Sequence, residues 1–103
     1  LFTRDLAGFD VAGLKAALAK VAGRKVMIVL NFPNNPTGYT ITKAEGAAIV
    51  AALTEAAAGG TKIIAVCDDA YYGMFYHPDC QSESLFGALA KGGDGSGERI
   101  FVF

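Results

Sequence analysis

The sequence predicts an α/β fold of the three-layer type, in which helices alternate with the strands of a parallel sheet. Apolar residues recur at helical spacing in three segments, short β-branched runs lie between these segments, and residues typical of turns separate most of them. The predicted order is helix, strand, helix, strand, helix, strand, without an internal repeat or a domain boundary. Strands joined by helical crossovers are expected to run parallel, with right-handed connections.

The first pair of elements is a helix followed by a strand. Asp10 is a candidate N-cap, and Gly23 is a candidate helix end. Apolar residues between them recur at helical spacing, at Val11, Leu14, Leu18 and Val21. Residues 25–30 (KVMIVL) are rich in β-branched side chains, which predicts a buried strand.

A second helix and strand follow a loop at residues 31–40 that is dense in Asn, Pro and Gly. Thr42 followed by Glu45 is a capping box, which predicts the start of a helix. The helix continues through Ile49, Val50 and Leu53 and ends at Gly59 and Gly60. Residues 62–67 (KIIAVC) predict a second buried strand.

The last third of the chain predicts a loop, a short helix and the start of a strand. Residues 68–80 are an aromatic-rich loop, residues 84–91 (SLFGALAK) an amphipathic helix, and residues 99–103 a third strand. The turn between this helix and the third strand contains Gly93, Gly95 and Gly97, which imitate part of a dinucleotide-binding motif. They precede a strand instead of opening a helix, so we expect no phosphate site there.

Composition excludes several classes of function. The net charge is −1, which offers no basic field for nucleic acid or an anionic membrane. No apolar run approaches the ~20 residues of a membrane helix, and the first ten residues do not resemble a signal peptide. Cys67 and Cys80 fit neither a zinc pattern nor a disulfide framework, so we expect no metal and a cytoplasmic location.

The chain is also unusually apolar for its length. Hydrophobic residues make up 52% of its 103 residues and charged residues 18%. The sequence begins with Leu1 instead of Met and ends in an apolar run at residues 100–103. These observations favour an internal piece of a larger protein.

Two polar segments follow the first two predicted strands, NFPNNPTG at residues 31–38 and DDAYYG at residues 68–73. In open parallel sheets, ligands bind beyond the carboxyl ends of the strands, so both segments should lie at one edge. The pattern alone predicts a site built from Asn34 or Asn35, Asp68 or Asp69, and Tyr71 or Tyr72.

The succession of N-N-P-T-G after one strand and D-x-A-Y after the next resembles the fold-type I enzymes that depend on pyridoxal phosphate (PLP), class I/II aminotransferases in particular. This resemblance implies that residues 1–103 are the central part of the large, PLP-binding domain. It implies that Asn35 and Tyr71 donate to the phenolic oxygen O3′ of PLP and that Asp68 accepts from the pyridine nitrogen N1. The Asn35–Pro36 bond would be cis.

These residue types suit PLP, which acts as an electron sink for a carbanion at the substrate α-carbon. A carboxylate against N1 raises the pKa of the ring nitrogen by charge pairing. Two neutral donors stabilise the negative charge on O3′ without adding a full charge. We expect Tyr39, Phe75 and Tyr76 to be walls or core, and we assign His77 no role.

The resemblance also implies a lysine that forms a Schiff base with PLP. We expect none of the six lysines to lie at the carboxyl edge of the sheet, namely Lys15, Lys20, Lys25, Lys43, Lys62 and Lys91. The chain therefore contains no predicted catalytic residue and should be inactive alone. The full-length protein is expected to transfer an amino group between an amino acid and a 2-oxo acid, as a homodimer.

Three other functions stay open. A C–S β-lyase or a decarboxylase on the same scaffold would use Asn35, Asp68 and Tyr71 equally well, because fold does not determine reaction. A non-catalytic PLP-fold domain could sense a ligand or bind a partner. A flavodoxin-like module would hold its ligand by backbone groups at a switch point of the sheet. Separately, Asn35 could be only a turn residue, because Asn-Pro-Thr-Gly is typical of turns.

Overall fold

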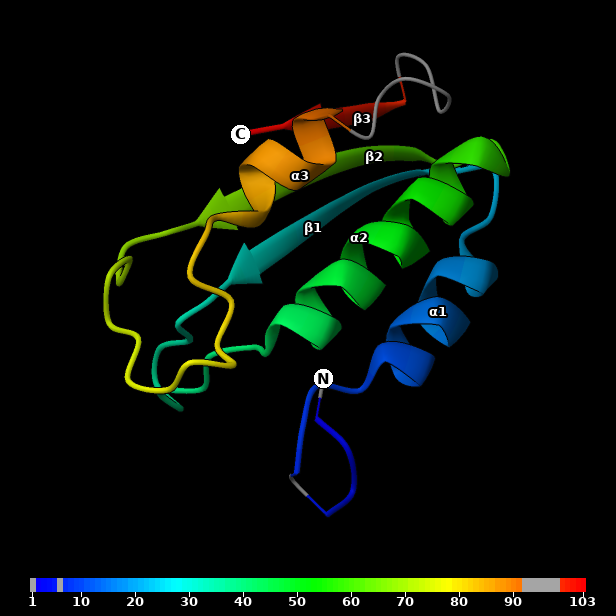
Figure 1. The fold of residues 1–103 in the computed structure, drawn as a ribbon. Coiled ribbons are helices and arrows are strands. Elements are labelled where there is room, and N and C mark those ends of the chain that lie inside the picture. Colours follow the sequence, from blue (N-terminus) through cyan, green and yellow to red (C-terminus); the bar gives the residue numbers. More distant parts are fainter. Residues whose placement is uncertain (1, 6, 92–98) are drawn as a thin grey trace.

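The computed structural model describes residues 2–5, 7–91 and 99–103. The elements within them are, in chain order, α1 (Val11–Lys20), β1 (Lys25–Asn31), α2 (Lys43–Ala58), β2 (Lys62–Asp68), α3 (Leu85–Lys91) and β3 (Ile100–Val102) (Figure 1). This alternation confirms the predicted α/β class and element order. The glycine-rich turn with Gly93, Gly95 and Gly97 lies outside the described residues.

The three strands form one parallel sheet in the order β1-β2-β3. β1 and β2 pair along their whole length, from Lys25 opposite Lys62 to Asn31 opposite Asp68. Each of these strands runs one residue further than the sequence pattern predicts, and the added residues are Asn31 and Asp68. The carboxyl ends of β1 and β2 therefore meet at one edge, where the two polar loops begin (Figure 1).

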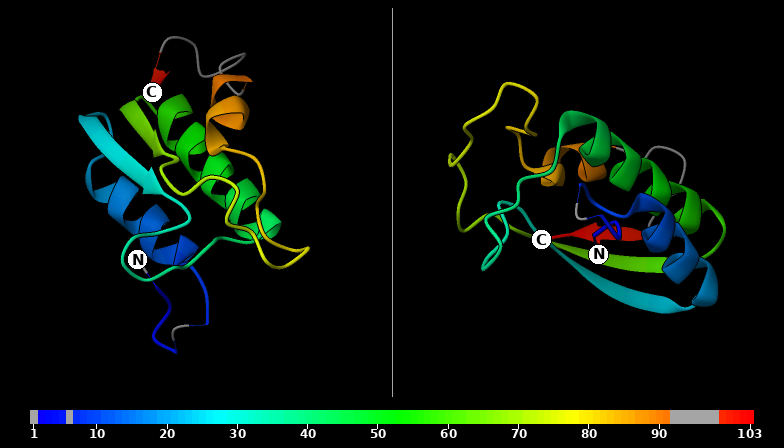
Figure 2. Two further views of the ribbon diagram at one scale, coloured as in Figure 1. Left: turned by 90° about the vertical axis from the view of Figure 1, so that its left-hand side faces the viewer. Right: turned by 90° about the horizontal axis from the view of Figure 1, so that it is seen from below.

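All three helices lie on the same face of the sheet (Figure 2). On that face the strand side chains are shielded, and Ile63 and Ala65 are fully buried. On the opposite face Met27 is 67% and Val29 is 59% exposed. The prediction of buried strands is therefore correct for one face and wrong for the other, because no described helix covers that second face.

The core lies between this sheet face and the helices. Each helix contributes buried leucine or isoleucine side chains, at Leu14, Leu18, Ile49, Leu53, Leu85 and Leu89. A fully buried side chain of this size contributes roughly 1.5–3 kcal/mol. None of the helices in the part of the chain described above has the length and hydropathy needed to cross a membrane.

Side-chain caps determine where the two longer helices start. The Asp10 carboxylate accepts from the Gly13 N–H at 2.7 Å, as the sequence predicts. At α2 the predicted capping box is present: the Thr42 hydroxyl accepts from the Glu45 N–H, and the Glu45 carboxylate accepts from the Thr42 N–H at 2.7 Å. The loop that leaves β1 leads directly into this capped N-terminus of α2.

Candidate functional site

The loop after β1 is held together by its own side chains. The Asn34 amide donates to Asn31 Oδ1 at 2.9 Å, and Asn34 Oδ1 accepts from Thr37 Oγ1 at 2.6 Å. The Asn34 main chain also donates to the Tyr39 carbonyl at 2.8 Å and accepts from the Gly38 N–H at 2.7 Å. Both ends of the Asn34 side chain are therefore used inside the loop, which leaves Asn35 as the residue that can face a ligand.

Asn35 reaches across to the second loop. Its N–H donates to Asn31 Oδ1 at 2.9 Å, and its side-chain Nδ2 donates to Tyr71 Oη at 3.2 Å. The Asn35–Pro36 peptide bond is cis, as predicted, and the Phe32–Pro33 bond is cis as well. The structure thus brings together the two residues that were expected to act as neutral donors.

Asp68 is the last residue of β2 and pairs in register with Asn31. Its exposed carboxylate accepts from the Ala70 N–H at 3.3 Å. The Asn31 side chain accepts from the Asn35 N–H, so Asp68 lies on the neighbouring strand directly opposite the residue that anchors Asn35.

The neighbouring Asp69 faces a different part of the structure. It lines a small hollow on the helix side of the sheet, together with Cys67, Ser84 and Leu85. Burial, with the nearby charge of Asp69, raises the pKa of the Cys67 thiol. Asp69 therefore lies near the start of α3, in a hollow that contains neither Asn35 nor Tyr71.

A cavity of about 550 Å³ lies beside the Asn35–Tyr71 pair. Its other lining residues come from both polar loops: Pro33, Asn34, Pro36, Gly38, Tyr39, Thr40, Met74, Tyr76, His77 and Cys80. Tyr39 and Tyr76 are walls, as predicted, whereas Phe75 packs edge-on against Tyr72 with ring centroids 5.6 Å apart. Asp68 is not among the lining residues, so the cavity carries the two neutral donors but not the acid.

Glu45 forms a larger hydrogen-bond cluster than its capping box predicts. Its carboxylate accepts from the Tyr39 hydroxyl at 2.8 and 2.9 Å and from the Phe9 N–H at 2.7 Å. Burial raises the pKa of Glu45, but hydrogen bonds from Thr42, Phe9 and Tyr39 outweigh it and hold that pKa below its ordinary value. Burial, with the Glu45 carboxylate, raises the pKa of Tyr39 to about 12. The sequence offered only the capping box as a signal for Glu45, and none for its contact with Tyr39.

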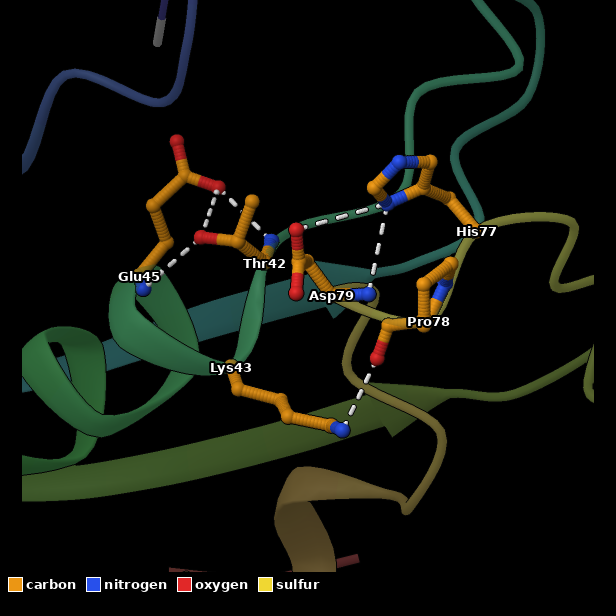
Figure 3. Close-up of polar contacts among 6 residues, drawn as sticks. All are labelled: Thr42, Lys43, Glu45, His77, Pro78 and Asp79. Carbon is orange, nitrogen blue, oxygen red and sulfur yellow. Dashed lines mark hydrogen bonds and ion pairs between the residues drawn. The ribbon is translucent and has the colours of Figure 1, made fainter.

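The second polar loop is attached to the N-terminus of α2 (Figure 3). Thr42 and Cys80 form an antiparallel bridge, and the Lys43 N–H donates to the Asp79 carbonyl at 2.9 Å. His77 Nδ1 accepts from the Asp79 N–H at 3.3 Å and lies 3.6 Å from the Asp79 carboxylate. Both polar loops are therefore attached to the same helix end.

Lys43 corrects one expectation from the sequence. It begins α2, whose N-terminus is at the carboxyl edge of the sheet, so one lysine does lie at that edge. Its Nζ donates to the Pro78 carbonyl at 2.8 Å, and its side chain borders a groove between α2 and α3. It does not line the cavity beside Asn35 and Tyr71.

The residues present fit the chemistry of a PLP ring. The hydrogen bond from Asn35 leaves the Tyr71 hydroxyl proton and the second amide N–H of Asn35 available as neutral donors. The Asp68 carboxylate at the adjacent strand end is an acceptor that suits a protonated ring nitrogen. Asn35, Tyr71 and Asp68 are thus the residues that could hold O3′ and N1.

Comparison with known proteins gives an independent assignment. The family model for aminotransferase class I and II matches residues 3–96. A search of the curated proteins found no match to the chain. Because the family match covers most of the 103 residues, the chain belongs to the class I and II aminotransferase family, whose members are generally PLP-dependent enzymes.

Proposed function

We propose that the full-length protein is a PLP-dependent aminotransferase and that this chain supplies Asn35, Asp68 and Tyr71 to its cofactor site. The observation that carries the proposal is the hydrogen bond from Asn35 Nδ2 to Tyr71 Oη, at 3.2 Å. It joins the loop that carries N-N-P-T-G to the loop that carries D-x-A-Y, the two motifs by which the chain resembles the family. Asp68 lies at the end of one of the two strands from which these loops leave.

Each residue has a distinct role in this proposal. PLP, when bound, supplies an electron sink for negative charge that develops at the substrate α-carbon. Asp68 holds a proton at the ring nitrogen N1 by charge pairing, which a neutral amide does poorly. Asn35 and Tyr71 donate to O3′ and stabilise its negative charge without placing a second full charge beside it.

No residue of this chain is proposed to move the substrate proton. Among the described residues, no lysine lines the cavity beside Asn35 and Tyr71. The proposal therefore needs a lysine from outside this chain, and the chain alone should not transaminate. Amino acid and 2-oxo acid substrates and a homodimeric assembly complete the proposal and rest on family membership. A cytoplasmic location is also proposed and rests on the two cysteines, which fit no disulfide framework.

The test uses the full-length protein with PLP and a panel of amino acid and 2-oxo acid pairs. The proposal predicts a visible absorbance band on PLP binding and the appearance of a new amino acid from the added 2-oxo acid. A protein that binds PLP but forms no new amino acid would contradict transamination. A protein that binds no PLP would contradict the cofactor site itself.

A further inference from the structure

Glu45 connects a helix end to the loop that carries Asn35. Its carboxylate accepts from two main-chain N–H groups, of Phe9 and Thr42, and from two hydroxyl groups, of Tyr39 and Thr42. A capping box uses only one of these four contacts, the one from the Thr42 N–H, and its other bond runs from the Glu45 N–H to the Thr42 hydroxyl. The contacts with Phe9 and Tyr39 are additional, so capping alone does not explain this arrangement.

The contact with Tyr39 leads to Asn35 through a continuous set of hydrogen bonds. The Tyr39 carbonyl accepts from the Asn34 N–H at 2.8 Å. Asn34 donates its side-chain amide to Asn31 Oδ1 at 2.9 Å, and the same oxygen accepts from the Asn35 N–H at 2.9 Å. The Tyr39 ring is also held from outside by Phe2, edge-on, with ring centroids 5.1 Å apart.

This arrangement matters because Asn35 is exposed and lies on a loop. A loop side chain that must aim at a ligand loses conformational freedom when the ligand binds, unless the loop is already ordered. Glu45 belongs to the first turn of a 16-residue helix whose buried face packs in the core. The helix N-terminus also favours a carboxylate at this point. Glu45 can therefore fix Tyr39 in place without moving itself.

We propose that Glu45, acting through Tyr39, is a positioning residue that orders the loop at residues 31–38 and aims Asn35 before the cofactor binds. The proposal rests on the proposed function for its cofactor, but the ordering of the loop is a property of the protein without cofactor. Glu45 and Tyr39 themselves are not proposed to touch PLP.

Two variants separate positioning from general stability. Tyr39→Phe removes the hydroxyl that binds Glu45 and keeps the ring and the capping box. Thr42→Ala removes the hydroxyl that caps α2, and with it one of the four contacts of the Glu45 carboxylate, but it keeps the contact between Glu45 and Tyr39. Loss of a cap of this kind measurably lowers helix stability. Thr42→Ala is thus the matched control, because it weakens the same helix end without releasing Tyr39.

The experiment measures amide hydrogen exchange and PLP affinity in the full-length protein. In Tyr39→Phe without cofactor, the Asn34, Asn35 and Gly38 amides should exchange about tenfold faster, and the Kd for PLP should rise by a similar factor. In Thr42→Ala both quantities should stay within about twofold of wild type, although its unfolding midpoint should fall by at least as much as that of Tyr39→Phe.

Each outcome decides the proposal. Unchanged exchange of these amides in Tyr39→Phe would overturn it, as would an equal change in Thr42→Ala. Faster exchange with unchanged PLP affinity would also overturn it, because loop order would then not serve Asn35. If the wild-type protein binds no PLP, the proposed function fails, and the exchange rates alone still show whether Glu45 and Tyr39 order the loop.

Discussion

The side-chain amide of Asn35 donates to the phenolic oxygen of Tyr71 at 3.2 Å, across two loops that leave neighbouring parallel strands. The two residues are far apart in the sequence and meet because β1 and β2 are adjacent and parallel. A pair of neutral donors that converge in this way can share one acceptor.

Removal of the Tyr71 hydroxyl should weaken PLP binding. In Tyr71→Phe, Asn35 remains as the single donor of the pair, so O3′ loses one hydrogen bond. We expect the Kd for PLP to rise on the order of tenfold in the full-length protein, measured by absorbance or fluorescence titration. Tyr72→Phe is the control, because Tyr72 packs against Phe75 and does not line the cavity. An equal effect of both variants would contradict the assignment.

Replacement of Asp68 should impair the reaction more than it impairs binding. Asp68→Asn keeps the size of the side chain and removes its charge, so N1 would lose the group that keeps it protonated. We expect the rate of the amino-acid half-reaction to fall by about 10²-fold or more, measured by stopped-flow absorbance. Asp69→Asn should change this rate little, because Asp69 lies on the helix side of the sheet. A larger loss in Asp69→Asn would show that the two acids were assigned the wrong way round.

Glu45 should make the protein sensitive to acid. Its pKa in the folded state is lowered, because hydrogen bonds to its carboxylate outweigh the effect of burial. A lowered folded pKa contributes stability above the unfolded pKa of about 4.3, and this stability is lost as pH falls through the folded value. The unfolding midpoint in urea should therefore drop between about pH 5 and pH 3 in wild type and drop less in Glu45→Gln. Parallel curves for the two proteins would contradict this prediction.

Gly38 should resist substitution for a reason of backbone geometry. It has φ of +69°, and an added Cβ would meet nothing within 4 Å, so only the left-handed conformation penalises a side chain. We expect Gly38→Ala to lower the free energy of unfolding by about 1–2 kcal/mol, measured by denaturant titration. Gly87→Ala is the control: Gly87 lies in α3, also has open space, and does not have a positive φ. This substitution should be neutral or slightly stabilising.

Local features could be predicted well from the sequence. The cap at Asp10 and the capping box of Thr42 and Glu45 depend on residues within one helical turn, and both are present. The two motif loops could be placed at one edge because helical crossovers make strands parallel. The preference for Asn35 over Asn34 came from the family pattern, and the structure adds a physical reason, since Asn34 is used inside its loop.

Features that depend on tertiary contacts could not be predicted. The exposed face with Met27 and Val29 has the same β-branched and apolar character as the buried face, so the sequence pattern does not distinguish them. The contact between Glu45 and Tyr39 depends on the path of a loop. Lys43 lies at the carboxyl edge because α2 begins there, and its side chain is held away from the cavity by the Pro78 carbonyl, a contact that depends on the path of the second loop.

The assignment of Asp68 to N1 is tested most directly by ¹⁵N NMR of PLP labelled at its pyridine nitrogen and bound to the full-length protein at neutral pH. We expect a protonated nitrogen in wild type and in Asp69→Asn, and loss of that protonation in Asp68→Asn. An unprotonated nitrogen in wild type, or a signal that does not change in Asp68→Asn, would contradict the assignment of Asp68 to N1.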